Sequence, residues 1–113
     1  MKNNAWIKEF CGSIIVCDQS GIIVEMNDRA VASYNDEGGS ALIGKNLLDC
    51  HSPRSQEILR DLLKTQKKNV YTIEKHGVKK IIYQSPWYEN GEFRGLVELS
   101  LEIPQGAPHF KRD

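Results

Sequence analysis

The sequence predicts an α+β domain: a five-stranded antiparallel sheet with short helices and one longer helix on one face. Three observations predict it. Strand-like segments rich in β-branched residues flank a helical middle, turn residues separate neighbouring strand segments, and one middle segment carries leucines at helical spacing. Strands adjacent in sequence pair as antiparallel hairpins, and the helical middle must cross one sheet face to bury its leucines.

The length and the net charge of the chain limit the kinds of protein it can be. The chain has 113 residues, of which 40% are hydrophobic, so one compact domain is expected. Its 15 basic and 15 acidic residues balance, which leaves no overall field to attract nucleic acid or an anionic membrane. Basic residues gather between positions 60 and 80, but no ladder of aromatic residues is interleaved with them, so they indicate a solvated helix face and hairpin edge.

The first eleven residues predict a helical cap or dimerisation segment, separate from a main domain at 12–103. Trp6, Ile7 and Phe10 fall at helical spacing before Gly12 interrupts the pattern. An exposed apolar triplet needs a cover, so we expect these three residues to pack on the sheet or to form a dimer interface.

A first hairpin and several short helices follow. Ser13–Asp18 and residues 22–26 read as strands around a turn at 19–21. Asn27 or Asp28 can cap a helix through the side-chain oxygen, and a second short helical piece is expected around residues 40–43.

The longer helix is predicted to begin at Ser52-Pro53, where a capping hydroxyl precedes a proline that needs no amide hydrogen. Its apolar face is formed by four residues, and its last turn is basic, which suits the negative end of the helix dipole. The apolar four are Ile58, Leu59, Leu62 and Leu63.

Three strands close the domain, at residues 70–75, 79–88 and 93–103. Asn90-Gly91 is a strong hairpin signal because both residues tolerate positive φ. In the last strand an apolar row alternates with a polar row, so we expect the apolar row to face the core and the polar row to face water. The apolar row is Val97, Leu99, Leu101 and Ile103, and the polar row is Glu98, Ser100 and Glu102. Residues 104–113 are expected to form an extended tail.

The location predicted from the sequence is cytoplasmic. The first ten residues lack the apolar stretch of a secretory signal, and no apolar run is long enough to cross a bilayer. Cys11, Cys17 and Cys50 are odd in number and include no Cys-x-x-Cys pair, which is typical of reduced thiols.

Taken together, residues 14–27, 42–48 and 89–101 make the chain resemble the PAS domain family over Ser13 to Ile103. The resemblance implies a sensor or interaction module in which a curved sheet and its helices enclose a small pocket. It further implies homodimerisation through the outer sheet face or a preceding helix, and an effector in a partner chain or a longer parent chain. The run from Cys50 to Ser55 is similar to a Cys-His-Pro-Pro-Lys-Ser segment of some bacterial PAS domains.

The resemblance also bears on cofactors. Flavin-binding relatives carry a reactive cysteine directly after Gly-x-Asn, whereas Leu47 follows Gly44-Lys45-Asn46 here, which argues against flavin. Photoactive yellow proteins need a tyrosine and a glutamate where this chain has Met26 and Ala30. Haem-binding relatives use a histidine on or near the long helix, and His51 lies just before that helix, so haem is the cofactor left open.

Five residues are candidates for ligand binding: His51, Cys50, Arg54, Tyr83 and Trp87. Each has a structural alternative. His51 could bind haem iron or simply donate to a backbone carbonyl, and Cys50 could be a redox thiolate or a buried small hydrophobe. Arg54 could join Ser52 and Ser55 in an anion site or lie in solvent. Tyr83, Ser85 and Trp87 share one strand face, which lines the pocket if it is the inner face and binds a partner if it is the outer one.

Catalytic constellations are not recognisable in the sequence. Cys11 and Cys17 are about 20 Å apart along an extended strand, too far to share a metal ion. Neighbouring Cys50 and His51 side chains diverge, so they do not form a nucleophile and base pair. We therefore predict a non-enzymatic PAS-type sensor that binds a small molecule, with a ligand-free protein interaction module as the alternative.

Overall fold

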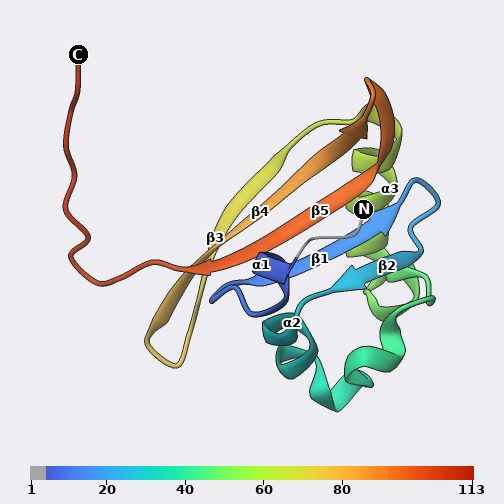
Figure 1. Ribbon diagram of the computed structural model, residues 1–113, viewed down its shortest axis with the longest axis horizontal. Coiled ribbons are helices and arrows are strands. Elements are labelled where there is room, and N and C mark those ends of the chain that lie inside the picture. Colours follow the sequence, from blue (N-terminus) through green and yellow to red (C-terminus); the bar gives the residue numbers. More distant parts are fainter. Residues whose placement is uncertain (1–4) are drawn as a thin grey trace.

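The computed structural model describes residues 5–113, apart from the side chain of Cys50. These residues form an antiparallel sheet with the strand order β2-β1-β5-β4-β3 (Figure 1). The predicted fold class, a five-stranded antiparallel sheet with helices, is confirmed. The strands are β1 (Ser13–Asp18), β2 (Ile23–Met26), β3 (Asn69–Lys75), β4 (Val78–Glu89) and β5 (Glu92–Glu102).

One short helix precedes β1, and the other helical elements fill the connection between β2 and β3. The α-helices are α1 (Ala5–Lys8), α2 (Asp28–Ser33) and α3 (Pro53–Thr65), and the 3-10 turns are η1 (Asn35–Glu37), η2 (Gly39–Leu42) and η3 (Leu47–Cys50). Figure 1 shows α3 crossing behind the sheet, whereas α1 lies in front of it. No helix within residues 5–113 is long and apolar enough to span a bilayer.

Local sequence signals account for most of the element boundaries. Asn27 is the cap of α2, and Ser52 caps α3 by accepting from the Ser55 amide, with Pro53 in the first turn. The β4–β5 hairpin turns at Asn90 and Gly91, whose φ angles of 53° and 80° are both positive, as its sequence predicts.

The buried core forms two clusters on the helix-covered face. One joins β1, β2, α2 and η2 through Ile15, Ile23, Met26, Ala30 and Leu42. In the other, Leu59 and Leu62 of α3 pack against Cys17 and Leu96. The helix thus buries two of its four predicted apolar residues there. Leu63 is half-buried against the same cluster, while Ile58 is largely exposed.

The predicted orientation of β5 is wrong. Leu96 belongs to the cluster beneath α3, and because side chains alternate, Glu98 lies on that same helix-covered face. Val97, Leu99 and Leu101 point to the opposite face, which we call the outer face. Alternation separates two rows without saying which row the helices cover, and pairing with β1 decides it by setting Leu96 beside Cys17 and Glu98 beside Ile15.

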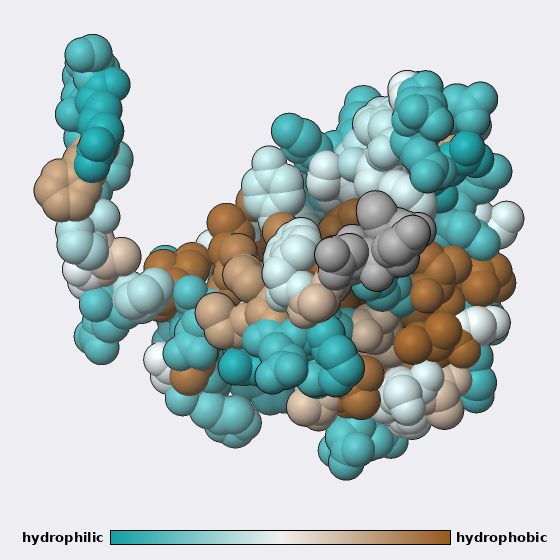
Figure 2. Space-filling view, in the orientation of Figure 1, coloured by the Kyte–Doolittle hydropathy of each residue, from teal (hydrophilic) through white to brown (hydrophobic). Residues whose placement is uncertain are grey.

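The outer face carries half-buried apolar side chains. Ile14 is buried beside Leu99, and Phe10 approaches Leu101 over Gly12, which has no side chain to keep them apart. Figure 2 shows apolar surface on both sides of α1 on this face. Beyond Glu102 the chain forms no strand or helix and runs away from the sheet (Figure 1).

Asn27 ties the amino-terminal segment to the sheet and to α2. Its Oδ1 accepts from the amides of Ile14 (2.9 Å) and Ala30 (3.0 Å), and its Nδ2 donates to the carbonyls of Gly12 (2.8 Å) and Ile7 (3.1 Å). The residue is 2% exposed, so water cannot replace these partners.

We predict that Asn27→Ala lowers the free energy of unfolding by about 2 to 4 kcal/mol, because it removes a helix cap and leaves buried backbone groups without partners. Urea denaturation followed by circular dichroism measures the change. Asn35→Ala, at an exposed asparagine of η1, is the control and should change stability by less than about 0.5 kcal/mol. Equal losses in the two variants would contradict this role of Asn27.

Candidate functional site

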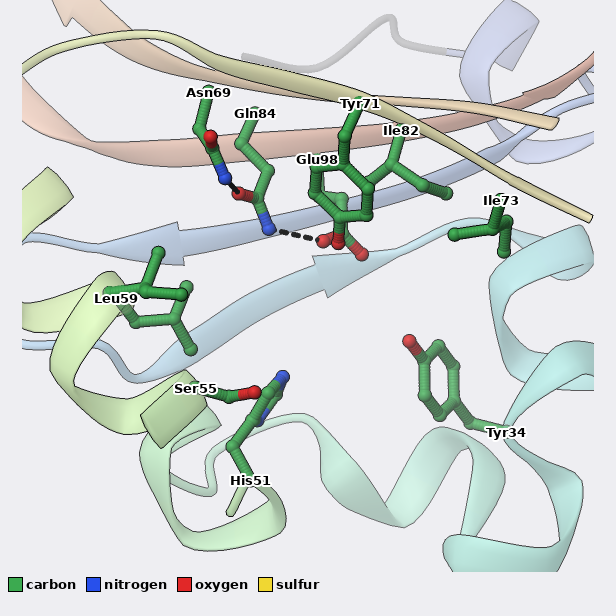
Figure 3. Close-up of a pocket in the computed structure, with 11 residues that line it drawn as sticks. Tyr34, His51, Ser55, Leu59, Asn69, Tyr71, Ile73, Ile82, Gln84 and Glu98 are labelled. Carbon is green, nitrogen blue, oxygen red and sulfur yellow. Dashed lines mark hydrogen bonds between the residues drawn. The ribbon is translucent and has the colours of Figure 1, made fainter. Parts of the chain in front are cut away.

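A cavity of about 530 Å³ lies between the sheet and the α3 side of the domain (Figure 3). A smaller one of about 110 Å³ adjoins it towards β2 and η2, and both are lined by Tyr34, His51 and Glu98. The remaining lining of the larger cavity is Ser55, Ile58, Leu59, Asn69, Tyr71, Ile73, Ile82 and Gln84. It therefore combines an apolar wall with polar groups from three strands.

The polar groups form a hydrogen-bonded row across β3, β4 and β5. Asn69, Gln84 and Glu98 are direct cross-strand partners. Asn69 Nδ2 donates to Gln84 Oε1 at 2.8 Å, and Gln84 Nε2 donates to Glu98 Oε2 at 2.7 Å (Figure 3). Gln84 is 7% exposed, so the row is built into the sheet and is not a solvated surface cluster.

Glu98 places a carboxylate at the centre of the site. It is half-buried on the middle strand of the sheet, and none of the ion pairs formed within the described residues includes it. Burial raises the pKa of the Tyr71 hydroxyl, and the charge of Glu98 raises this pKa further. The cavity therefore has a negative field on its sheet side.

His51 faces this row from the helical side. Its Nδ1 is 2.7 Å from the carbonyl oxygen of Leu47, and because a carbonyl only accepts, Nδ1 carries the hydrogen. The structural alternative for this residue, donation to a backbone carbonyl, is thus present in the structure. In the neutral ring Nε2 remains as an acceptor, and Figure 3 shows the ring beside Ser55, across the cavity from Gln84 and Glu98.

The other candidate residues lie elsewhere. Arg54 is exposed on the outside of α3, where it borders a shallow surface groove, and Ser52 caps the helix. Tyr83 and Trp87 project to the outer face and line neither cavity, because their positions alternate with Ile82 and Gln84. The side chain of Cys50 lies outside the described part of the chain.

Trp87 has a structural role on the outer face. Its Nε1 donates to the carbonyl of Cys17 at 3.1 Å, although the two residues are 70 positions apart. The side chain reaches β1 across Gly95, where any Cβ would collide with that carbonyl. Trp87 therefore fastens β4 to β1 over the central strand.

The lining does not suit haem. His51 could offer Nε2 to iron, but the opposite wall carries the amide and carboxylate row, which is a poor surface for the porphyrin. None of the described residues that line either cavity is a lysine or arginine that could pair with propionates. Within the described residues, no group of three or more His, Cys, Asp or Glu side chains could hold a metal ion.

Asn69, Gln84 and Glu98 were missed as site residues by sequence reasoning. The two-residue turn at Asn90-Gly91 alone would set Gln84 opposite Val97, and a register shift between Trp87 and Tyr88 sets it opposite Glu98 instead. The one signal in the sequence is that a polar side chain occurs on each of three consecutive strands. That signal becomes informative only when the covered face of β5 is known, since polar residues on a solvated face would look the same.

The two cysteines whose side chains are described should differ in reactivity. Cys17 is buried under α3, and burial raises the pKa of its thiol above the ordinary value of about 9.0, so it stays protonated and unreactive at neutral pH. Cys11 is exposed. We predict that iodoacetamide at pH 7.5 alkylates Cys17 roughly tenfold or more slowly than Cys11. Peptide mass mapping measures both rates, and similar rates in the folded protein would contradict the prediction. Urea, which exposes Cys17, should equalise them.

Several solved structures are similar to this chain. The PAS domain of an HTR-like protein from Haloarcula marismortui has a TM-score of 0.59 at 21% identity, covering 88% of this chain and 87% of that chain. The Aer2 receptor of Vibrio cholerae, described as a dual PAS-heme oxygen sensor, has a TM-score of 0.61 at 15% identity and coverage of 82% and 95%. A C-terminal domain from Streptococcus mutans reaches 0.72 at 19% identity and coverage of 90% and 83%. Neither a family model nor a curated protein sequence matches the chain.

Proposed function

Because the chain has the fold of a PAS domain, we propose that it is a sensory signalling domain that binds a small molecule between α3 and the sheet and relays its state to a partner. The observation that carries this proposal is the cavity of about 530 Å³ into which Glu98, Gln84 and His51 converge. A concave site with an apolar wall and a few placed polar groups is typical of small-molecule sites. The similar Aer2 receptor, described as an oxygen sensor, supports the sensory part.

The relay is supported by the two sides of the cavity. A molecule that contacts both His51 and Glu98 would bridge the η3–α3 junction and the central strand. The outer face of that same strand carries Val97 and Leu99, so a shift of β5 changes the cavity wall and the outer surface together. Binding energy that differs between two positions of β5 or α3 would provide the signal.

For the signalling output we propose a homodimer that uses α1 and the outer face. Trp6 is 67% exposed and meets Phe10 edge to face, with ring centroids 6.3 Å apart, while Ile7 is half-buried. These are the residues of the dimer interface expected from the sequence. The effector would be a separate protein or part of a longer parent chain, and we place the domain in the bacterial cytoplasm without catalytic activity of its own.

A ligand-free interaction module is the second candidate, and the exposed apolar side chains of the outer face favour it. The two candidates differ in whether the cavity is occupied. We predict that native mass spectrometry of the gently purified protein shows a small-molecule adduct, which Ser55→Trp removes by filling the cavity.

Ser40→Trp is the control for this experiment, because Ser40 is exposed on η2 and lines neither cavity, so the adduct should persist. If the Ser55→Trp protein retains the adduct, the cavity is not the binding site. A protein that carries no adduct and gains none on incubation with cell extract would favour the interaction module.

The dimer is tested separately on the outer face. Leu99→Arg places a charge among apolar side chains in the middle of that face, so we predict that it raises the dimer dissociation constant at least about tenfold. Sedimentation equilibrium measures this constant. Ile43→Arg changes an equally apolar, exposed residue on the helical side and should leave the constant unchanged. Equal effects of the two variants would refute an interface on the outer face.

A further inference from the structure

The two cavities have an unequal charge distribution. Glu98 lines both of them, whereas none of their described lining residues is a lysine or arginine. Partly burying a carboxylate without a cation is unfavourable, since the group loses part of its hydration and the hydrogen bonds that the protein supplies replace only some of it. The chemical class of a ligand that suits the cavity can be inferred from this imbalance.

We propose that the molecule bound in the larger cavity is a small organic amine whose protonated nitrogen donates to the Glu98 carboxylate. This inference rests on the proposed ligand-binding function and specifies the ligand class.

The geometry around Glu98 supports an ammonium group. Gln84 donates to Oε2 of the carboxylate, while a carboxylate can accept at several positions on both oxygens. Asn69 occupies the oxygen of Gln84, which keeps the Gln84 amide nitrogen turned towards Glu98. The row therefore holds the carboxylate in place for a further donor without neutralising its charge.

The rest of the lining suits the organic part of such a molecule. Tyr71 and Tyr34 contribute aromatic rings, whose faces attract cations (Figure 3). Leu59, Ile73 and Ile82 form the apolar wall against which a hydrocarbon body can pack. His51, whose Nδ1 donates to Leu47, presents Nε2 as a second acceptor for a donor at the far end of the ligand.

The same charges select against other ligands. An organic anion would approach Glu98 with no described basic side chain in the lining to compensate for the repulsion. A neutral molecule would leave the carboxylate without a counter-charge. Preference for a cation over a neutral molecule and an anion of the same shape is therefore the signature of this site.

Three probes share one ring and differ in charge: benzylamine, benzyl alcohol and benzoate. Each is titrated into the ¹⁵N-labelled 113-residue protein at pH 7, and amide shifts of residues that line the cavity report the dissociation constants. We expect benzylamine to bind about tenfold more tightly than benzyl alcohol, because the charged hydrogen bond exists only with the amine, and benzoate to bind most weakly.

Glu98→Gln should reduce the affinity for benzylamine about tenfold, to that for benzyl alcohol, and leave benzyl alcohol unaffected. Glu102→Gln is the matched control, since Glu102 lies on the same strand and face but is exposed and lines neither cavity. It should keep the preference for the amine. The comparison of the three probes on the unmodified protein decides the question even if Glu98→Gln does not fold.

The outcomes separate the ligand class from the function. If benzyl alcohol or benzoate shifts the cavity amides at the same or lower concentration than benzylamine, the amine is refuted and the small-molecule cavity stands. Benzylamine binding that survives Glu98→Gln also refutes it. If no probe shifts these amides, the amine is refuted, and the adduct measurement with Ser55→Trp decides separately whether the cavity binds a small molecule.

Discussion

The carboxylate of Glu98, on the helix-covered face of the central strand, is the constraint around which the domain is arranged. Leu59 and Leu62 of α3 pack against Cys17 and Leu96 in a buried cluster. Two residues further along β5, on the same face as Leu96, the side chain is that of Glu98. A cavity lies between the sheet and the helical side at this position. A second hydrophobic layer over Glu98 would desolvate the charge, so the open space and the carboxylate require each other.

The opposite face of β5 follows from the same arrangement. Since successive side chains point to opposite faces, the polar positions that form the cavity wall leave Val97, Leu99 and Leu101 on the outside. The strand that lines the cavity is thus also the strand that presents the apolar outer surface. The proposed communication between the two surfaces would need no long pathway, because they are the two sides of one backbone segment held between β1 and β4.

Sequence reasoning located the elements far better than it oriented them. Caps and turns are local: Asn27, Ser52-Pro53 and Asn90-Gly91 act on neighbouring backbone groups, so the residues alone predict them. The sidedness of β5 depends on its pairing with β1, some 80 residues away, and no local pattern contains that information. Predicting the site residues was limited in the same way, because most of them come together only through strand pairing. His51 was found because it precedes a recognisable helix, whereas Asn69, Gln84 and Glu98 become a site only when three strands align.

The direction of the hydrogen bonds across these strands adds a last point. Asn69, on the edge strand, donates inward to Gln84, and Gln84 donates inward to Glu98, so each amide fixes the orientation of the next group. Such a row is cooperative, because donating at one end strengthens accepting at the other. A domain whose only task was to hold two proteins together would gain nothing from this arrangement at the centre of its sheet, where an apolar row would pack against α3. The row is better explained as a preorganised acceptor, held in position before its partner arrives.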